Sequence, residues 1–194
     1  INGFVIRKEN APYKAIIQIS HGMTEYAERY ELFMNFMAEN GFVMVAHDHL
    51  GHKNSVNSKE ELGFFASVDG YKCVLSDLAT TAGRMKKSFP QLKLFLLGHS
   101  MGSFLVRQYL GLYSEGLSGA IIMGTGDQPD AILAAGKMVC KLIGTLKGWN
   151  YRSAFINNMA IGGYEKKMGK AWLTRDSVIV EKYAKDPLCG FMFT

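Results

Sequence analysis

A serine between two glycines is the residue of this 194-residue sequence best placed to act as a nucleophile. Gly98, Ser100 and Gly102 form a G-x-S-x-G pattern directly after the apolar run 94–97. At a strand-to-helix junction this pattern is typical of a nucleophile elbow, a turn so sharp that it exposes the serine hydroxyl. A side chain at either glycine would collide with the neighbouring strand or helix. The pattern therefore predicts acyl-transfer chemistry at Ser100, with Gly98, His99 and Gly102 supporting the turn.

A nucleophilic serine also needs hydrogen-bond donors for the oxyanion that its attack creates. In an elbow one donor is the backbone N–H of the following residue, which here is Met101. The second comes from a loop after an earlier strand. Gly22 and Met23 follow the strand predicted over 15–20, so we expect the Met23 N–H to be this donor, with Gly22 allowing a close approach.

His21 precedes this loop and is the first candidate for the catalytic base. In such sites, however, the order along the chain is Ser, then Asp or Glu, then His. The sequence has no histidine after His99, so the expected triad cannot be completed within these residues. We therefore interpret His21 as a hydrogen-bonding support of the oxyanion loop. The same interpretation covers the other four histidines, at positions 47, 49, 52 and 99.

Strand and helix patterns alternate over residues 1–126. Strands are predicted at 3–7, 15–20, 42–46, 94–97 and 120–123, and helices at 28–40, at 68–88 and behind the elbow. Such alternation indicates an α/β fold with a mostly parallel sheet flanked by helices. Ligands of these sheets bind beyond the carboxyl ends of the strands. The loops 21–26, 47–55 and 99–103 lie at those ends.

The alternation stops after residue 126. The sequence predicts a helix from 127 to about 148, a loop over 149–163 and at least one helix within 165–183. We expect residues 1–126 to form the N-terminal part of the core and residues 127–194 to form a helical cap or lid. Four aspartates in this second part follow Ser100, at positions 127, 130, 176 and 186, and none is assigned as a catalytic acid. The apolar side of the first cap helix either lines an acyl pocket or packs on the core.

The composition excludes several classes of function. Three cysteines without metal-ligand spacing argue against a metal site, and no cofactor is expected. The net charge is +5, and residues 127–194 hold ten Lys and Arg against six Asp and Glu. This basic excess is either an ordinary solvated surface or suits contact with an anionic membrane surface or an anionic substrate. The sequence has no basic stripe interleaved with aromatic residues, so nucleic acid is not expected as a partner. Without an apolar run long enough to span a bilayer or a signal-peptide pattern, a soluble cytoplasmic protein is expected.

Six segments in this order resemble the bacterial lysophospholipase and monoacylglycerol lipase branch of the α/β-hydrolases, the serine aminopeptidase-like group. They are H-G-M-T-E at 21–25, D-H-L-G-H at 48–52, G-H-S-M-G-S at 98–103, G-T-G at 124–126, W-L-T-R-D at 172–176 and D-P-L-C-G-F at 186–191. The resemblance extends from end to end. One departure is that Leu50 and Lys53 replace an arginine and a glycine of the usual D-H-R-G-H-G-x-S loop.

This resemblance implies hydrolysis of carboxylic esters of small or lipid-like alcohols, without a cofactor, beneath a helical cap. It implies Ser100 as nucleophile, Met23 and Met101 as oxyanion donors, and a triad Asp and His beyond Thr194.

Two hypotheses about function follow. One is a serine hydrolase of lysophospholipids or monoacylglycerols, with an aminopeptidase or thioesterase relative as a variant. The other is a catalytically incomplete hydrolase-fold fragment that at most binds apolar ligands. The intact elbow and oxyanion loop favour the first.

Overall fold

A five-stranded sheet is the centre of the computed structural model, which describes residues 1–169 and 173–194. The strand order is β1-β3-β2-β4-β5, with β1 antiparallel to β3 and every other neighbouring pair parallel. The strands are β1 (Gly3–Ile6), β2 (Ala15–Ser20), β3 (Phe42–His47), β4 (Lys93–His99) and β5 (Gly119–Met123). The predicted α/β class and mostly parallel sheet are confirmed.

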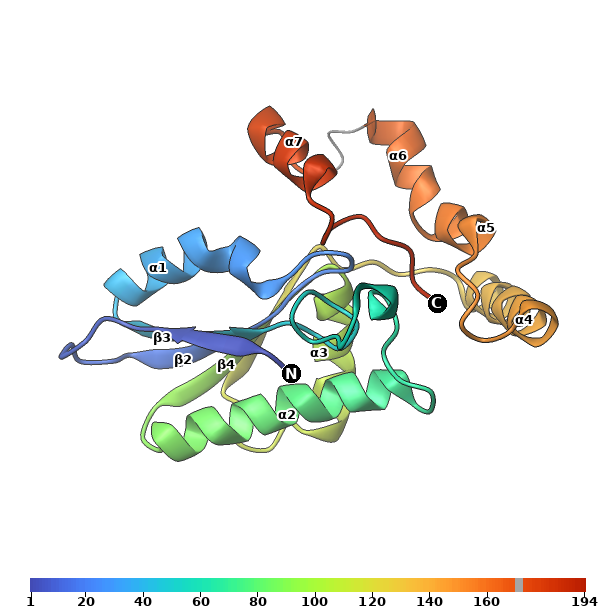
Figure 1. Cartoon of the computed structure of the whole chain (residues 1–194). Coiled ribbons are helices and arrows are strands. Elements are labelled where there is room, and N and C mark those ends of the chain that lie inside the picture. The colour runs from blue at the N-terminus through green and yellow to red at the C-terminus, as the bar shows by residue number, and fades with distance from the viewer. Residues whose placement is uncertain (170–172) are drawn as a thin grey trace.

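Helices cover both faces of this sheet, as Figure 1 shows. The 3-10 turn η1 (Ala27–Tyr30) leads into α1 (Glu31–Glu39), and the turn η2 (Lys59–Glu61) precedes α2 (Gly70–Ser88) and α3 (Met101–Leu112). On one face Met34 of α1 packs with Ile17 and Ile19 of β2. On the other, Leu75 of α2 packs with Leu105 of α3. Every residue of β2 is buried because both faces of this central strand are covered.

The parallel strands β2, β3 and β4 all end at one edge of the sheet. Their register pairs Ser20, the last residue of β2, with Gly98 near the end of β4. The loop after β2 and the turn after β4 therefore leave the sheet side by side. This pairing brings residues 21–26 to Ser100 although about 75 residues separate them in the sequence.

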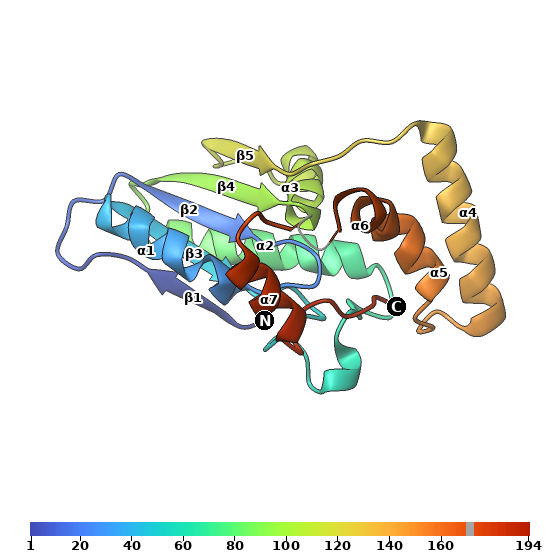
Figure 2. The same ribbon diagram turned by 90° about the horizontal axis from the view of Figure 1, so that it is seen from above.

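Residues beyond β5 form further helices, of which α4, α5 and α6 lie away from the strands (Figure 2). These are α4 (Asp130–Lys147), α5 (Ala154–Asn157), the π-helical turn η3 (Asn158–Gly162), α6 (Gly163–Met168) and α7 (Ser177–Lys185). The predicted loop over 149–163 is wrong, because the chain is helical from residue 154. Ser153 starts this segment by accepting a hydrogen bond from the Ile156 amide at 3.3 Å. Gly163 adopts helical backbone angles (φ −65°, ψ −38°) instead of breaking the helix.

The predicted apolar side of α4 is largely uncovered. Ile132 is 57% exposed, Leu142 59% and Leu146 72%. None of the helices in the described ranges has the length and apolar character needed to cross a membrane. Membrane contact through this region stays a prediction.

The last nine residues return from the helical region to loops of the core. The amide of Gly190 donates to the carbonyl of Thr24 at 3.2 Å, and the amide of Thr194 donates to the carbonyl of Gly63 at 3.1 Å. Arg152 also donates to the carbonyl oxygens of Glu60 and Met192. The division into 1–126 and 127–194 remains a prediction. Trp172 of the 172–176 motif lies outside the described residues.

Candidate active site

Ser100 forms the junction between β4 and α3 in a strained backbone conformation. Its φ of 54° and ψ of −119° are angles that residues with a side chain seldom adopt. The Ser100 amide donates to the Met123 carbonyl of β5 at 2.9 Å. The Ser100 carbonyl accepts from the Ser103 amide at 2.9 Å and from the Ser103 hydroxyl at 2.6 Å. The sharp turn is therefore held from the sheet and from the helix, as the predicted elbow requires.

Both glycines of the elbow are required by close approaches of backbone. A Cβ at position 98 would lie 2.5 Å from the Gly102 carbonyl oxygen. A Cβ at position 102 would lie 1.9 Å from the carbonyl oxygen of Ser20, at the end of β2. The predicted collisions with helix and strand are confirmed. The absence of these side chains lets α3 start directly against β2.

The loop after β2 passes beside the predicted nucleophile. A Cβ at position 22 would lie 3.3 Å from the Ser100 Cβ. Gly22 is followed by Met23, whereas Met101 opens α3 on the other side of Ser100. Within residues 1–169 and 173–194 neither the Met23 nor the Met101 amide donates a hydrogen bond. The two amides thus flank the serine, and the Met101 amide lies at the positive end of the α3 dipole.

Glu25 is a residue of the site to which sequence reasoning assigned no role. Its Oε1 accepts hydrogen bonds from the Gly22 amide (2.6 Å), the Tyr30 hydroxyl (2.7 Å) and Nδ1 of His99 (3.3 Å). Its Oε2 lies 3.4 Å from Nε of Arg29. Burial by itself would raise the pKa of Glu25, but hydrogen bonds from His99 and Tyr30 lower it to about 2. One ionised carboxylate therefore joins the oxyanion loop to the residue before Ser100. The sequence signal for Glu25 was its position as the last residue of the H-G-M-T-E segment at 21–25.

His21 is completely buried beneath this loop, with both ring nitrogens occupied. Its Nδ1–H donates to the Gly22 carbonyl at 2.8 Å, and its Nε2 accepts from the His49 amide at 3.0 Å. Burial, together with the neighbouring His52, lowers the pKa of His21 to about 3. These contacts join His21 to the loop at Gly22 and to the backbone of His49; its role as a support of an oxyanion loop stays a prediction.

Three further histidines surround His21 in the core. The ring centroid of His21 lies 4.1 Å from that of His49 and 4.9 Å from that of His52, and His47 lies 5.3 Å from His49. His49 Nε2 also contacts the Ser20 hydroxyl at 3.1 Å. The described residues contain no cluster of His, Cys, Asp and Glu suited to a metal ion. We interpret the cluster as packing beneath the oxyanion loop.

The loop after β3 contacts the core at both positions, Leu50 and Lys53, where it departs from the expected pattern. Leu50 packs against the α2 side of the core. The Lys53 ammonium pairs with Glu28 and lies 4.1 Å from the Tyr26 ring centroid. Asp48 accepts from the Ala27 amide at 2.9 Å. This loop is thus tied to the start of η1, beside the oxyanion loop.

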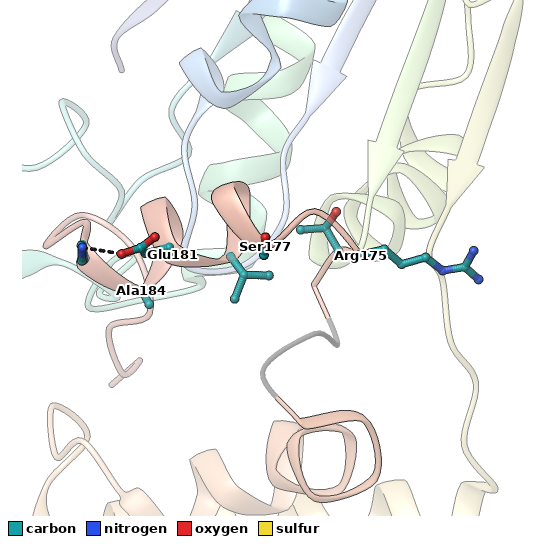
Figure 3. Close-up of a pocket in the computed structure, with 7 residues that line it drawn as sticks. Arg175, Ser177, Glu181 and Ala184 are labelled. Atoms are coloured by element: carbon teal, nitrogen blue, oxygen red, sulfur yellow. Dashed lines mark hydrogen bonds and ion pairs between the residues drawn. The ribbon is translucent and has the colours of Figure 1, made fainter.

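Two pockets lie outside the elbow. The first, of about 430 Å³, lies along α7 and is lined by residues including Arg175, Ser177 and Glu181 (Figure 3). The second, of about 350 Å³, lies between residues 63–71, Trp149 and Phe193. Ser100 lines neither of them.

Comparison with known proteins gives one consistent family. The family model described as serine aminopeptidase, S33, matches residues 11–194. A monoglyceride lipase homolog of Monkeypox virus is 27% identical over 175 residues, which are 90% of this chain and 56% of that protein. Monoglyceride lipase of Mus musculus is 26% identical over 186 residues, 93% of this chain and 54% of that protein. The chain spans about half the length of these relatives.

Solved structures agree. A thermostable carboxyl esterase from Bacillus coagulans superposes with a TM-score of 0.87 at 26% identity, covering 98% of this chain and 62% of that one. A monoglyceride lipase from Saccharomyces cerevisiae, at 16% identity and a TM-score of 0.71, shows the shared fold; it covers 96% of this chain and 58% of that one. With the elbow and the mostly parallel sheet, these matches establish an α/β-hydrolase fold, and the chain belongs to the serine aminopeptidase S33 family of hydrolases.

Proposed function

We propose that this protein is a serine hydrolase that cleaves carboxylic esters through an acyl-enzyme on Ser100. The observation that carries the proposal is the strained elbow at Ser100, with the Met101 amide on one side and the Gly22–Met23 loop on the other. A serine is kept at such backbone angles only where the surrounding structure enforces them, and this occurs mainly at functional sites. The proposed substrates are monoacylglycerols or lysophospholipids. The monoglyceride lipases among the relatives support this class.

In the proposed mechanism the Ser100 hydroxyl attacks the ester carbonyl carbon while a general base takes its proton. The carbonyl oxygen becomes an oxyanion and accepts hydrogen bonds from the Met23 and Met101 amides. Collapse of this intermediate breaks the bond to the alcohol, which leaves with the proton from the base. Water then attacks the acyl-enzyme by the same steps and releases the fatty acid.

We assign no base among the histidines of this chain. His21 has both ring nitrogens in hydrogen bonds. His99 directs Nδ1 to Tyr30 at 2.8 Å and to Glu25. His47, His49 and His52 are buried in the core. The activity therefore has to be tested in protein expressed from the complete reading frame that encodes this sequence.

The test is intact mass before and after exposure to a fluorophosphonate probe, with hydrolysis of a monoacylglycerol measured on the same preparation. One adduct at Ser100, absent from Ser100→Ala and present in the exposed-serine control Ser114→Ala, is expected. Parallel assays with a lysophospholipid, an aminoacyl amide and an acyl thioester identify the substrate class. A preparation that takes up no probe and hydrolyses none of these substrates would contradict the proposal. The alternative of a fragment that only binds apolar ligands would then be favoured.

A further inference from the structure

Thr24, the residue after Met23, has an unusual backbone conformation. Its φ is +55°, in the left-handed region, and it is 7% exposed. A β-branched residue at positive φ is strained, because Cβ crowds the neighbouring carbonyl groups. A relaxation of Thr24 would rotate the Met23–Thr24 peptide and so displace Met23, whose own N–H belongs to the adjoining Gly22–Met23 peptide. The position of the Met23 amide therefore depends on what holds Thr24.

Contacts from the far end of the chain hold Thr24. Its side-chain hydroxyl lies 2.7 Å from the hydroxyl of Tyr183, a residue of α7 that is 159 positions away. Its carbonyl accepts the hydrogen bond from the Gly190 amide. Figure 1 shows the chain leaving α7 and running back toward the loops at this edge of the sheet. Both the side chain and the backbone of the strained residue are thus bound by residues after the elbow.

Neighbouring contacts fix Tyr183 in turn. The guanidinium carbon of Arg29 lies 5.0 Å from the Tyr183 ring centroid. The Tyr26 hydroxyl donates to Oδ2 of Asp186, just beyond α7, at 2.7 Å. Burial raises the pKa of Tyr183, so its hydroxyl stays protonated at neutral pH. The end of α7 is therefore joined to residues 24–29 by three contacts: Tyr183 with Thr24, Tyr183 with Arg29, and Asp186 with Tyr26.

We propose that Tyr183 is a positioning residue for ester hydrolysis, whose hydroxyl acts through Thr24 to hold the Met23 amide beside Ser100. The inference rests on the proposed function, because it assigns Met23 as an oxyanion donor. An oxyanion donor lowers the barrier only when it is aligned before the charge develops. The last cap helix thereby contributes to catalysis without touching the substrate carbonyl.

The test separates catalysis per active site from the amount of folded protein. Titration with a fluorophosphonate counts competent Ser100 residues, and kcat is expressed per titrated serine. Tyr183→Phe and Thr24→Val each remove one hydroxyl while keeping side-chain shape. Each is expected to lower kcat about five- to tenfold, with KM within about twofold. The double variant is expected to lose no more than either single one, because both remove the same bond.

Tyr151→Phe is the matched control, since Tyr151 lies in the link between α4 and α5 and is 48% exposed. It is expected to keep the parent kcat. If Tyr183→Phe reduces only the titrated fraction, and kcat per titrated serine is unchanged, the positioning role is overturned. Additive losses in the double variant overturn it as well. A parent that neither titrates nor hydrolyses ester overturns the proposed function, and this inference with it.

Discussion

The carboxylate of Glu25 accepts a hydrogen bond from the backbone amide of Gly22 at 2.6 Å, across the turn that contains Met23. The same oxygen accepts a hydrogen bond from His99, the residue before Ser100. Glu25 therefore connects the two backbone segments that supply the proposed oxyanion donors. Because charge-assisted hydrogen bonds are about twice as strong as neutral ones, this connection depends on the ionised carboxylate.

Replacement of Glu25 by glutamine is expected to reduce kcat for ester hydrolysis by about tenfold or more, because the loop loses a charge-assisted anchor. KM should change less, because the role proposed for Glu25 is to align the oxyanion donors and not to bind the acyl chain. Steady-state kinetics on a monoacylglycerol measure both constants. Glu9→Gln, an exposed glutamate, is the control. A glutamine variant with the parent kcat would show that the charge at position 25 is not needed.

Gly102→Ala is expected to destabilise the fold severely. Its Cβ would lie 1.9 Å from the Ser20 carbonyl oxygen and 2.7 Å from that of His21, both backbone atoms. The expected loss is at least about 3 kcal/mol in the free energy of unfolding, measured in urea.

Gly111 in the same helix is the matched control, because a Cβ there meets nothing within 4 Å. Gly111→Ala should leave stability unchanged or raise it by up to about 1 kcal/mol through helix propensity. Equal effects at both positions would contradict the close approach of α3 to β2.

Ser100→Gly is expected to abolish ester hydrolysis and to stabilise the fold. Glycine adopts φ 54° and ψ −119° without the crowding of a Cβ. The gain in the free energy of unfolding should be about 1 to 3 kcal/mol, the cost of one strained residue. Ser100→Ala keeps the strain and serves as the comparison in thermal unfolding. If the two variants unfold at the same temperature, the elbow stores no measurable strain.

Stability should fall with acid between pH 6.5 and about 4. Burial lowers the pKa of His47 and His52 to about 4, and that of His21 to about 3, from the ordinary 6.5. In this window the unfolded chain binds protons that the folded core excludes, so each histidine costs up to about 1.4 kcal/mol per pH unit. Well above pH 6.5 all three are neutral in both states and the loss disappears.

Urea midpoints measured from pH 7.5 to 4.5 check this dependence. His52→Gln removes one titrating group and should reduce the slope of unfolding free energy against pH. An unchanged slope in this variant, or a stability that rises on acidification, would contradict neutral buried histidines. Glu25 adds a separate loss of stability at lower pH. Between pH 4.5 and about 2 its carboxyl group takes up a proton in the unfolded chain but stays ionised in the folded protein.

Local sequence was enough to predict the elbow and the sheet. Alternating strand and helix patterns indicated the parallel core, and the spacing of Gly98, Ser100 and Gly102 indicated a turn that only glycines permit. These features depend on neighbouring residues and on steric rules that hold for any chain. The helical segment after Ser153 contradicts the loop predicted over 149–163, since a serine cap starts it and Gly163 continues it with helical backbone angles.

The tertiary structure alone decided which side chains hold the oxyanion loop. Glu25 meets His99 across 74 residues, and Thr24 meets Tyr183 across 159. No local pattern encodes these pairs, because they form only when the register of β2 with β4 and the return of the chain after α7 bring distant backbones together. The sequence by itself determined which serine is proposed as the nucleophile. Packing determined which carboxylate and which hydroxyls keep the backbone around that serine in place.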